Sequence, residues 1–214
     1  MAEKSSETPR ERYRVQIRAE VKRRAWEQIA SAGASALSLN AIAKQMGMSG
    51  PALYRYFANR DELITELIRD AYQSLADTVQ AATTLSADLG VVAHALRRWA
   101  LEDPQRYFLI YGTPVPGYQA PDDTTVIADE IMSVLLKACA KSIPERPATP
   151  LDKHLEDHRQ WADASYPPSV LHRALTFWTR CHGVLSLELA GHFTGMGLDP
   201  AKLFEAELDD LLTP

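Results

Sequence analysis

The side chains best suited to chemistry in this sequence stand close together in SGPALYRY, residues 49–56. Gly50 and Pro51 lie side by side, and an arginine between two tyrosines follows at once. Proline needs no N–H in the first turn of a helix, so the pair fits a helix that starts after Ser49. Hydroxyl and guanidinium groups at the exposed end of such a helix are suited to bind phosphates and base edges of DNA.

A second group of residues has the spacing of metal ligands. His154 and His158 stand four positions apart, on one face of a helix, and Asp152 and Asp157 are nearby. Zinc sites use this spacing, but the sequence offers no convincing third ligand. We therefore favour a solvated helix over a metal site and expect neither a metal nor a cofactor.

Catalytic motifs are missing from the sequence, and we do not expect an enzyme. There is no Gly-rich phosphate loop, no nucleophile elbow and no HExxH motif. Cys181 and His182 are adjacent, so a helix would point them in different directions. The only other cysteine is Cys139, and two distant cysteines outside any CxxC motif fit a reduced, cytoplasmic setting.

Charge is distributed unevenly along the 214 residues. Residues 1–60 hold 11 Lys and Arg against 5 Asp and Glu, a balance of +6. Residues 61–214 hold 12 against 23, a balance of -11, which brings the whole chain to -5. A basic end on an acidic body indicates a local contact with a polyanion. No apolar run approaches the roughly 18 residues that cross a bilayer, so no membrane partner is expected.

Apolar residues recur at helical spacing throughout, and strict alternation occurs nowhere, which predicts an all-α fold of about nine helices. Residues 1–9 are polar and are expected to form a disordered tail. The expected helical segments are about 10–32, 38–46, 49–56, 59–82, 86–102, 103–112, 124–142, 151–164, 169–193 and 200–212.

The residue pattern of LNAIAKQMGMSGPALYRYF, residues 39–57, is typical of a helix-turn-helix. Ala43 supplies a small residue where two helices cross, and Gly47 supplies a turn that tolerates positive φ. Ile42 and Leu53 fall where they can lock the helices together. The second helix would then present its N-terminal end to a DNA major groove.

These residues resemble the DNA-binding domain of the tetracycline-repressor (TetR) family, whose pattern is roughly T-x-x-x-I-A-x-x-x-G-V-S-x-x-x-L-Y-x-Y-F-x-x-K-x-x-L. The resemblance covers about residues 12–68, and TrpxxxHisGly in 178–191 is similar to the penultimate helix of one subgroup. Ser38, Met48 and Arg60 stand where the family has Thr, Val and Lys. The matching positions are Ser38, Ile42, Ala43, Gly47, Ser49, Leu53, Tyr54, Tyr56, Phe57, Arg60 and Leu63.

The resemblance implies a homodimeric transcriptional regulator, usually a repressor, that binds palindromic double-stranded DNA and is released by a small molecule. It implies a helix-turn-helix domain over residues 10–58 and a ligand-binding and dimerisation domain over 59–214. Carried over by position, the phosphate contacts are Ser38, Ser49, Tyr56 and Arg60. The residues that face base edges are Asn40, Gly50, Pro51, Tyr54 and Arg55. Arg55 is suited to guanine or to a phosphate alike.

The body is expected to hold both the dimer interface and the effector pocket. The apolar stripes of 169–193 and 200–212 suit a four-helix interface between subunits, and we expect Trp178, His182 and Gly183 in the core. Loop 113–123 and segment 143–168 are expected at the mouth of the pocket. An aromatic lining would favour a flat or apolar effector. The candidate lining residues are Trp99, Phe108, Tyr111, Tyr118, Trp161 and Trp178.

Two alternatives remain open from the sequence. One is a helical protein that sequesters a small molecule and carries an inactive DNA-binding head. The other is a metal sensor that uses His154 and His158.

Overall fold

The computed structural model describes residues 8–84, 86, 88–121, 123–141 and 146–213. Within these residues the chain forms ten α-helices, nine of them at least seven residues long, and no strand. The predicted all-α fold is therefore confirmed. In chain order the elements are α1 (Pro9–Ala32), the 3-10 turn η1 (Ala34–Ala36), α2 (Leu39–Gln45), α3 (Gly50–Leu53), α4 (Arg60–Thr83), α5 (Leu89–Glu102), α6 (Pro104–Tyr111), α7 (Asp123–Cys139), α8 (Pro150–Asp157), α9 (Pro168–Leu189) and α10 (Pro200–Leu212).

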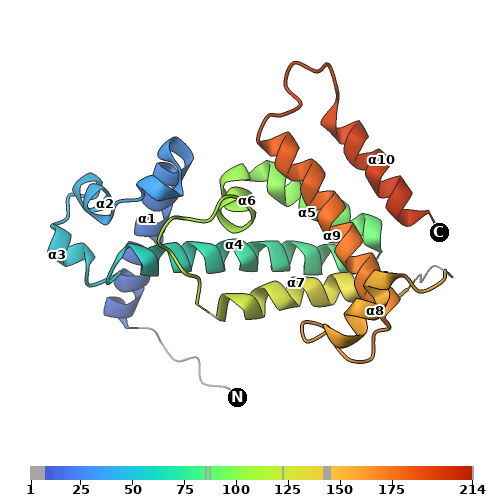
Figure 1. Cartoon of the computed structure of the whole chain (residues 1–214). Coiled ribbons are helices and arrows are strands. Elements are labelled where there is room, and N and C mark those ends of the chain that lie inside the picture. The colour runs from blue at the N-terminus through green and yellow to red at the C-terminus, as the bar shows by residue number, and fades with distance from the viewer. Residues whose placement is uncertain (1–7, 85, 87, 122, 142–145, 214) are drawn as a thin grey trace.

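The first three helices form a small unit, residues 8–59, that we call the head (Figure 1). Thr8 caps α1 through a capping box with Glu11, so the predicted disordered tail is wrong for Thr8 and Pro9, which start the helix. Residues 1–7 lie outside the described part of the chain. Gly33 ends α1 with φ 78°, a conformation that favours glycine.

The turn between α2 and α3 has the predicted chemistry. Ser38 accepts a hydrogen bond from the Ala41 N–H and so caps α2. Gly47 adopts φ 65°, which a residue with a Cβ rarely adopts. Ile42 and Leu53 are fully buried between α1 and α4, and they fix the angle between the two short helices.

Helix α4 joins the head to the rest of the molecule, which we call the body. Figure 1 shows it crossing the molecule from the head to the far side. Leu63 and Leu67, near its start, are buried in the core of the head, and Leu75 and Val79 are buried in the core of the body. One rigid helix therefore belongs to both hydrophobic cores, and the predicted domain boundary at residue 58 lies just before it.

The body packs α5 to α10 around the second half of α4. Figure 1 shows α9 and α10 side by side at the C-terminal side of the molecule, and α7 runs along α4. Buried side chains such as Trp99, Tyr107 and Phe177 fill the space between these layers. No helix among the described residues is long and apolar enough to cross a membrane.

Several helix ends differ from the sequence-based expectation. Helix α5 starts at Leu89 because Asp88, rather than the expected Ser86, accepts the capping hydrogen bond from the Gly90 N–H. Helices α3, α8 and α9 end at Leu53, Asp157 and Leu189, several residues earlier than expected. Helix ends depend on local capping and on packing that periodicity does not report.

Candidate DNA-binding face and effector cavity

The N-terminal end of α3 is the most exposed part of the helix-turn-helix. Ser49 occupies the cap position, but its hydroxyl makes no capping hydrogen bond and stays exposed. Pro51 follows in the first turn, where its missing N–H costs no helical hydrogen bond. The start of α3 thus presents an exposed hydroxyl that caps nothing within the head and is available to an anion.

Tyr54 and Arg55 project from the far end of the same short helix. The Tyr54 side chain is 44% exposed although the ring is large and apolar. Arg55 is exposed and has no hydrogen-bond or ion-pair partner among the described residues. Leu53, directly before them, is fully buried and anchors the helix. The two residues can therefore reach a ligand while α3 stays fixed.

Gly50 brings α3 close to α2. A Cβ built on Gly50 would lie 3.3 Å from Oδ1 of Asn40, an exposed residue of α2. The missing side chain leaves room for the Asn40 amide at the outer surface of both helices. An amide in this place has the donor and acceptor that adenine recognition requires.

The backbone of Tyr56 and the side chain of Arg60 make contacts within the head, and both residues were predicted to hold phosphates. The Tyr56 carbonyl accepts a hydrogen bond from the Arg18 guanidinium, which lies over the Phe57 ring. Arg60 donates to the carbonyls of Ala34, Ser35 and Leu37 at 3.0 to 3.3 Å. The first bond ties the segment before α4 to α1, and the others tie the start of α4 to η1 and Leu37 and occupy Nε and Nη2 of Arg60.

Most of the positive charge on α1 is neutralised internally. Arg18 lies 3.3 Å from the Glu66 carboxylate, and Lys22 lies 2.6 Å from that of Asp70. Lys44 on α2, in contrast, is exposed and has no partner among the described residues. The same holds for three arginines near the start of α1: Arg10, Arg12 and Arg14. The candidate contacts from sequence omitted Lys44, whose free charge could be identified only once the ion pairs were known.

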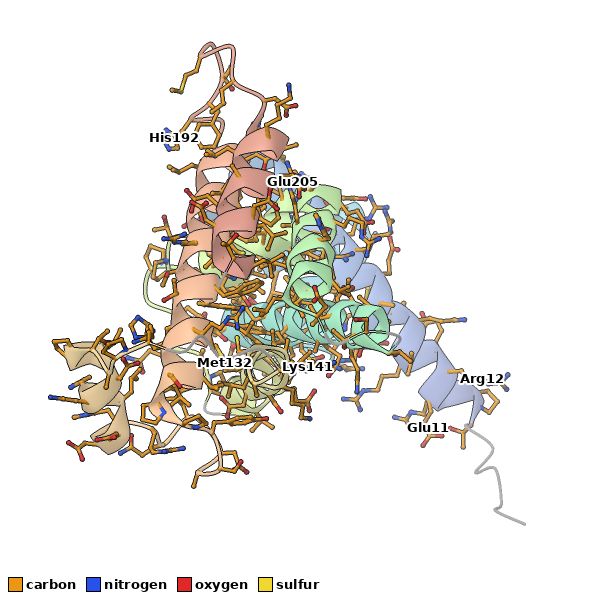
Figure 2. All side chains as sticks on the ribbon, turned by 90° about the vertical axis from the view of Figure 1, so that its right-hand side faces the viewer. Glu11, Arg12, Met132, Lys141, His192 and Glu205 are labelled. Carbon is orange, nitrogen blue, oxygen red and sulfur yellow. The ribbon has the colours of Figure 1, made fainter. Side chains whose placement is uncertain are left out.

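A cavity of about 420 Å³ opens between α4, α6, α7 and α9. Seven of its described lining side chains are apolar or aromatic: Tyr72, Tyr111, Ala128, Met132, Trp161, Leu175 and Trp178. Tyr111, Trp161 and Trp178 are three of the six candidates from sequence. Figure 2 labels Met132, a lining residue that α7 contributes next to α9.

The other three candidates lie elsewhere. Trp99 is 3% exposed, and its indole N–H donates to the Ser74 hydroxyl at 3.1 Å. Phe108 packs edge-on against Tyr107, with ring centroids 5.7 Å apart. Tyr118, from the loop after α6, has its hydroxyl 2.9 Å from that of Thr65 on α4. Tyr72 lines the cavity as well but was not among the candidates from sequence.

The Trp178, His182 and Gly183 motif is only partly core. The His182 ring contacts Tyr111 and Trp178 behind the cavity wall, with centroids 4.3 and 4.2 Å apart. Burial lowers the pKa of His182 to about 4, so the imidazole is neutral near neutral pH. Gly183, expected in the core, is exposed, and a Cβ there would meet no atom of this chain.

His154 and His158 lie on the surface of the body. Their rings stack with centroids 4.0 Å apart, and Nδ1 of His158 lies 2.9 Å from the His154 carbonyl oxygen. Across the described ranges, no three His, Cys, Asp or Glu side chains gather closely enough to hold a metal ion.

A helical chain with a helix-turn-helix head and a cavity-bearing helical body has the architecture of a DNA-binding regulator with its own sensor domain. Residues 23–67 match the sequence profile of "Bacterial regulatory proteins, tetR family", and residues 89–211 match "Tetracyclin repressor-like, C-terminal domain". The chain belongs to the TetR family of transcriptional regulators and is not an enzyme.

Known proteins agree with this assignment. The HTH-type transcriptional regulators Rv1816 of Mycobacterium tuberculosis and Mb1846 of Mycobacterium bovis are each 36% identical over 210 residues, 91% of this chain and 90% of theirs. A solved structure of a regulatory protein, SCO4313, superposes with a TM-score of 0.91 at 70% identity, covering 97% of this chain and 100% of that one. The TetR family regulator PfmR of Thermus thermophilus shares the fold at 16% identity, with a TM-score of 0.59 over 90% of this chain and 96% of that one.

Proposed function

We propose that this regulator is a cytoplasmic repressor that binds a palindromic operator as a homodimer and leaves it when a small apolar or aromatic molecule fills the cavity. The observation that carries the proposal is the exposure of Tyr54 and Arg55 on a helix whose other face is fully anchored. Large and charged side chains without partners at the tip of a head are best explained by a partner outside the chain.

In this proposal the outer ends of α2 and α3 enter the major groove. Tyr54 and Arg55 read base edges together with Asn40, Gly50 and Pro51. Ser38 and Ser49 bind phosphates, and we add Lys44 to them because its charge is free. Tyr56 contributes through its phenolic hydroxyl, because its backbone N–H and carbonyl are already bonded within the head. Arg60 contributes through Nη1, which lies 3.7 Å from the exposed Asp61 carboxylate, since its Nε and Nη2 hold the head together.

The proposed dimer forms through α9 and α10, which lie side by side in Figures 1 and 2. On the outer side of α9, Leu187 is 45% exposed and Gly183 is bare. A glycine inside an exposed helix costs about 1 kcal/mol relative to alanine, and close approach of another backbone would explain it. A two-fold axis there gives the two heads the symmetry of a palindrome.

Release from DNA is proposed to act through α4 and α6. Tyr72 of α4 and Tyr111 of α6 line the cavity. Farther along, α4 carries Glu66, which pairs with Arg18 of α1, and Thr65, which bonds Tyr118 in the loop after α6. A ligand that shifts α4 would therefore tilt the head, because the Arg18–Glu66 pair holds the head to α4. A shift of α6 would reach the same stretch of α4 through the bond between Tyr118 and Thr65.

Selection of DNA from a random pool by the purified protein tests this function. The proposal predicts enrichment of a palindrome with half-site centres one or more helical turns apart, about 10 base pairs per turn. Enrichment of a sequence without two-fold symmetry contradicts the proposed homodimer. Absence of any enrichment contradicts operator binding and favours a protein that only sequesters its ligand.

A further inference from the structure

We propose that the cavity selects organic cations, so that the effector is an apolar or aromatic molecule with a positive charge. That the bound cation acts as the effector rests on the proposed function. The cation site itself depends only on the cavity. Two features carry it: the aromatic walls and a lone carboxylate at the same cavity.

The walls present aromatic rings from several directions. Tyr111 of α6 stands edge-on to Tyr72 of α4, with ring centroids 6.0 Å apart and an angle of 87°. It also stands edge-on to Trp178 of α9, at 5.6 Å and 77°. Trp161 adds a fourth ring to the lining. The face of an aromatic ring carries negative electrostatic potential, so a lining that holds four rings attracts a cation, especially a weakly hydrated one.

The only charged side chain in the described lining is negative. Asp129 of α7 lies at the cavity and has no ion-pair or hydrogen-bond partner within the described parts of the chain. No lysine, arginine or histidine is part of the described lining. His182, behind Tyr111 and Trp178, is neutral because burial lowers the pKa of its imidazole to about 4.

This combination discriminates among three kinds of ligand. An anion would be repelled by Asp129 and by the ring faces. A neutral apolar molecule would fill the cavity but would gain nothing from the carboxylate. A cation gains from both, and it can bury its apolar groups against Met132 and Leu175 as well. The lining therefore favours a cation over a neutral molecule of the same shape.

Tetraphenylphosphonium and tetraphenylborate provide a direct test, because they match in size and shape and differ in the sign of the charge. Binding of each to the full-length protein without DNA is measured by calorimetry. The proposal predicts that the phosphonium binds at least about tenfold more tightly than the borate. Equal affinities, tighter binding of the borate, or no binding of either ion overturns it.

Two substitutions locate the site. Asp129→Asn removes the charge at the cavity and is expected to weaken phosphonium binding about threefold. Glu130→Gln is the matched control, since Glu130 is the next residue on α7, is exposed, and does not line this cavity. Equal effects of the two substitutions would mean that the ion responds to general surface charge, and the proposed site would be wrong.

A DNA arm separates this proposal from the proposed function. If the phosphonium binds as predicted and also lowers affinity for the selected DNA, both stand. If it binds but leaves DNA affinity unchanged, the cation site stands and its role as the effector site is contradicted. If the protein binds DNA but not the phosphonium, the proposed DNA-binding function is supported and the proposed cation site is contradicted.

Discussion

The phenolic hydroxyl of Tyr107 on α6 lies 2.9 Å from Nδ1 of His182 on α9. The same hydroxyl lies 2.8 Å from that of Ser186, one turn farther along α9. Nε2 of His182 is buried and has no hydrogen-bond partner among the described residues, and the ring contacts Tyr111 and Trp178. A neutral imidazole therefore joins two helices at the wall of the cavity.

This buried histidine makes stability depend on pH. Its pKa falls from 6.5 to about 4 because burial disfavours the charged form. Between these values the unfolded chain binds more protons than the folded one, so stability is lost as pH falls below about 6.5. We expect the His182 contribution to the free energy of unfolding to drop by about 2 kcal/mol from pH 7 to pH 5.

Urea unfolding of the wild type and of His182→Asn at the two pH values measures this contribution. Asparagine keeps a group that can meet the Tyr107 hydroxyl but does not titrate. The substitution is expected to reduce the acid-induced loss of stability by about 2 kcal/mol, whatever its effect at pH 7. An identical loss in both proteins would show that His182 does not titrate as proposed.

Gly47 and Gly50 are expected to respond differently to alanine. Gly47→Ala forces a Cβ into φ 65° and should lower the free energy of unfolding by about 1 to 2 kcal/mol. Gly50→Ala meets only the end of the Asn40 side chain at 3.3 Å, so stability should hardly change while affinity for the selected DNA falls. Thermal unfolding and fluorescence anisotropy distinguish the two effects. Unchanged DNA affinity of Gly50→Ala would contradict the assignment of Gly50 to the DNA face.

Free and paired cations on the head should differ in the salt dependence of DNA binding. Lys44 has no partner in the described structure, whereas Arg23 forms ion pairs with Glu20 and Glu27. Lys44→Ala should make the slope of log K against log salt less steep by about 2 in a dimer, because each subunit loses one phosphate contact. Arg23→Ala should leave the slope unchanged. The prediction fails if the two variants give the same slope.

Because Gly183 is exposed on α9, we expect a charged substitution there to weaken the dimer without unfolding the subunit. Gly183→Glu places a charged side chain where no atom of this chain lies, so the folded subunit should tolerate it. The expected result in sedimentation equilibrium is a dimer dissociation constant raised at least about tenfold, since an unpaired charge would be buried between subunits. Val126→Glu, at a 60% exposed site on α7, is the control. Unchanged dimerisation of the Gly183 variant would move the interface away from α9.

The helix-turn-helix was predictable because its determinants are local. Ser38 caps α2 and Gly47 takes positive φ within a few residues of the motif they define. The start of α5 was not predictable in the same way. Ser86 and Asp88 both have side chains that can cap a helix. Asp88 is the cap in the structure, and the helix that it starts buries Leu89 against the core.

The cavity was harder to infer, because its walls depend on how each helix is rotated in the packed body. Trp99 and Trp178 look alike in sequence, yet Trp99 is buried against Ser74 and Trp178 lines the cavity. Nothing in the sequence marks Asp129 as a residue of the cavity. Its importance arises only from its position beside aromatic side chains brought by other helices.

The most direct test of the account is the DNA affinity of Tyr54→Ala, measured by fluorescence anisotropy on the selected palindrome. Leu101→Ala is the matched control, since Leu101 is 42% exposed, close to the 44% of Tyr54, and lies on α5 of the body. The account predicts that Tyr54→Ala stays folded and dimeric and loses at least about tenfold in affinity, while Leu101→Ala binds like the wild type. Wild-type affinity of a folded Tyr54→Ala dimer would contradict the claim that this end of α3 reads the operator.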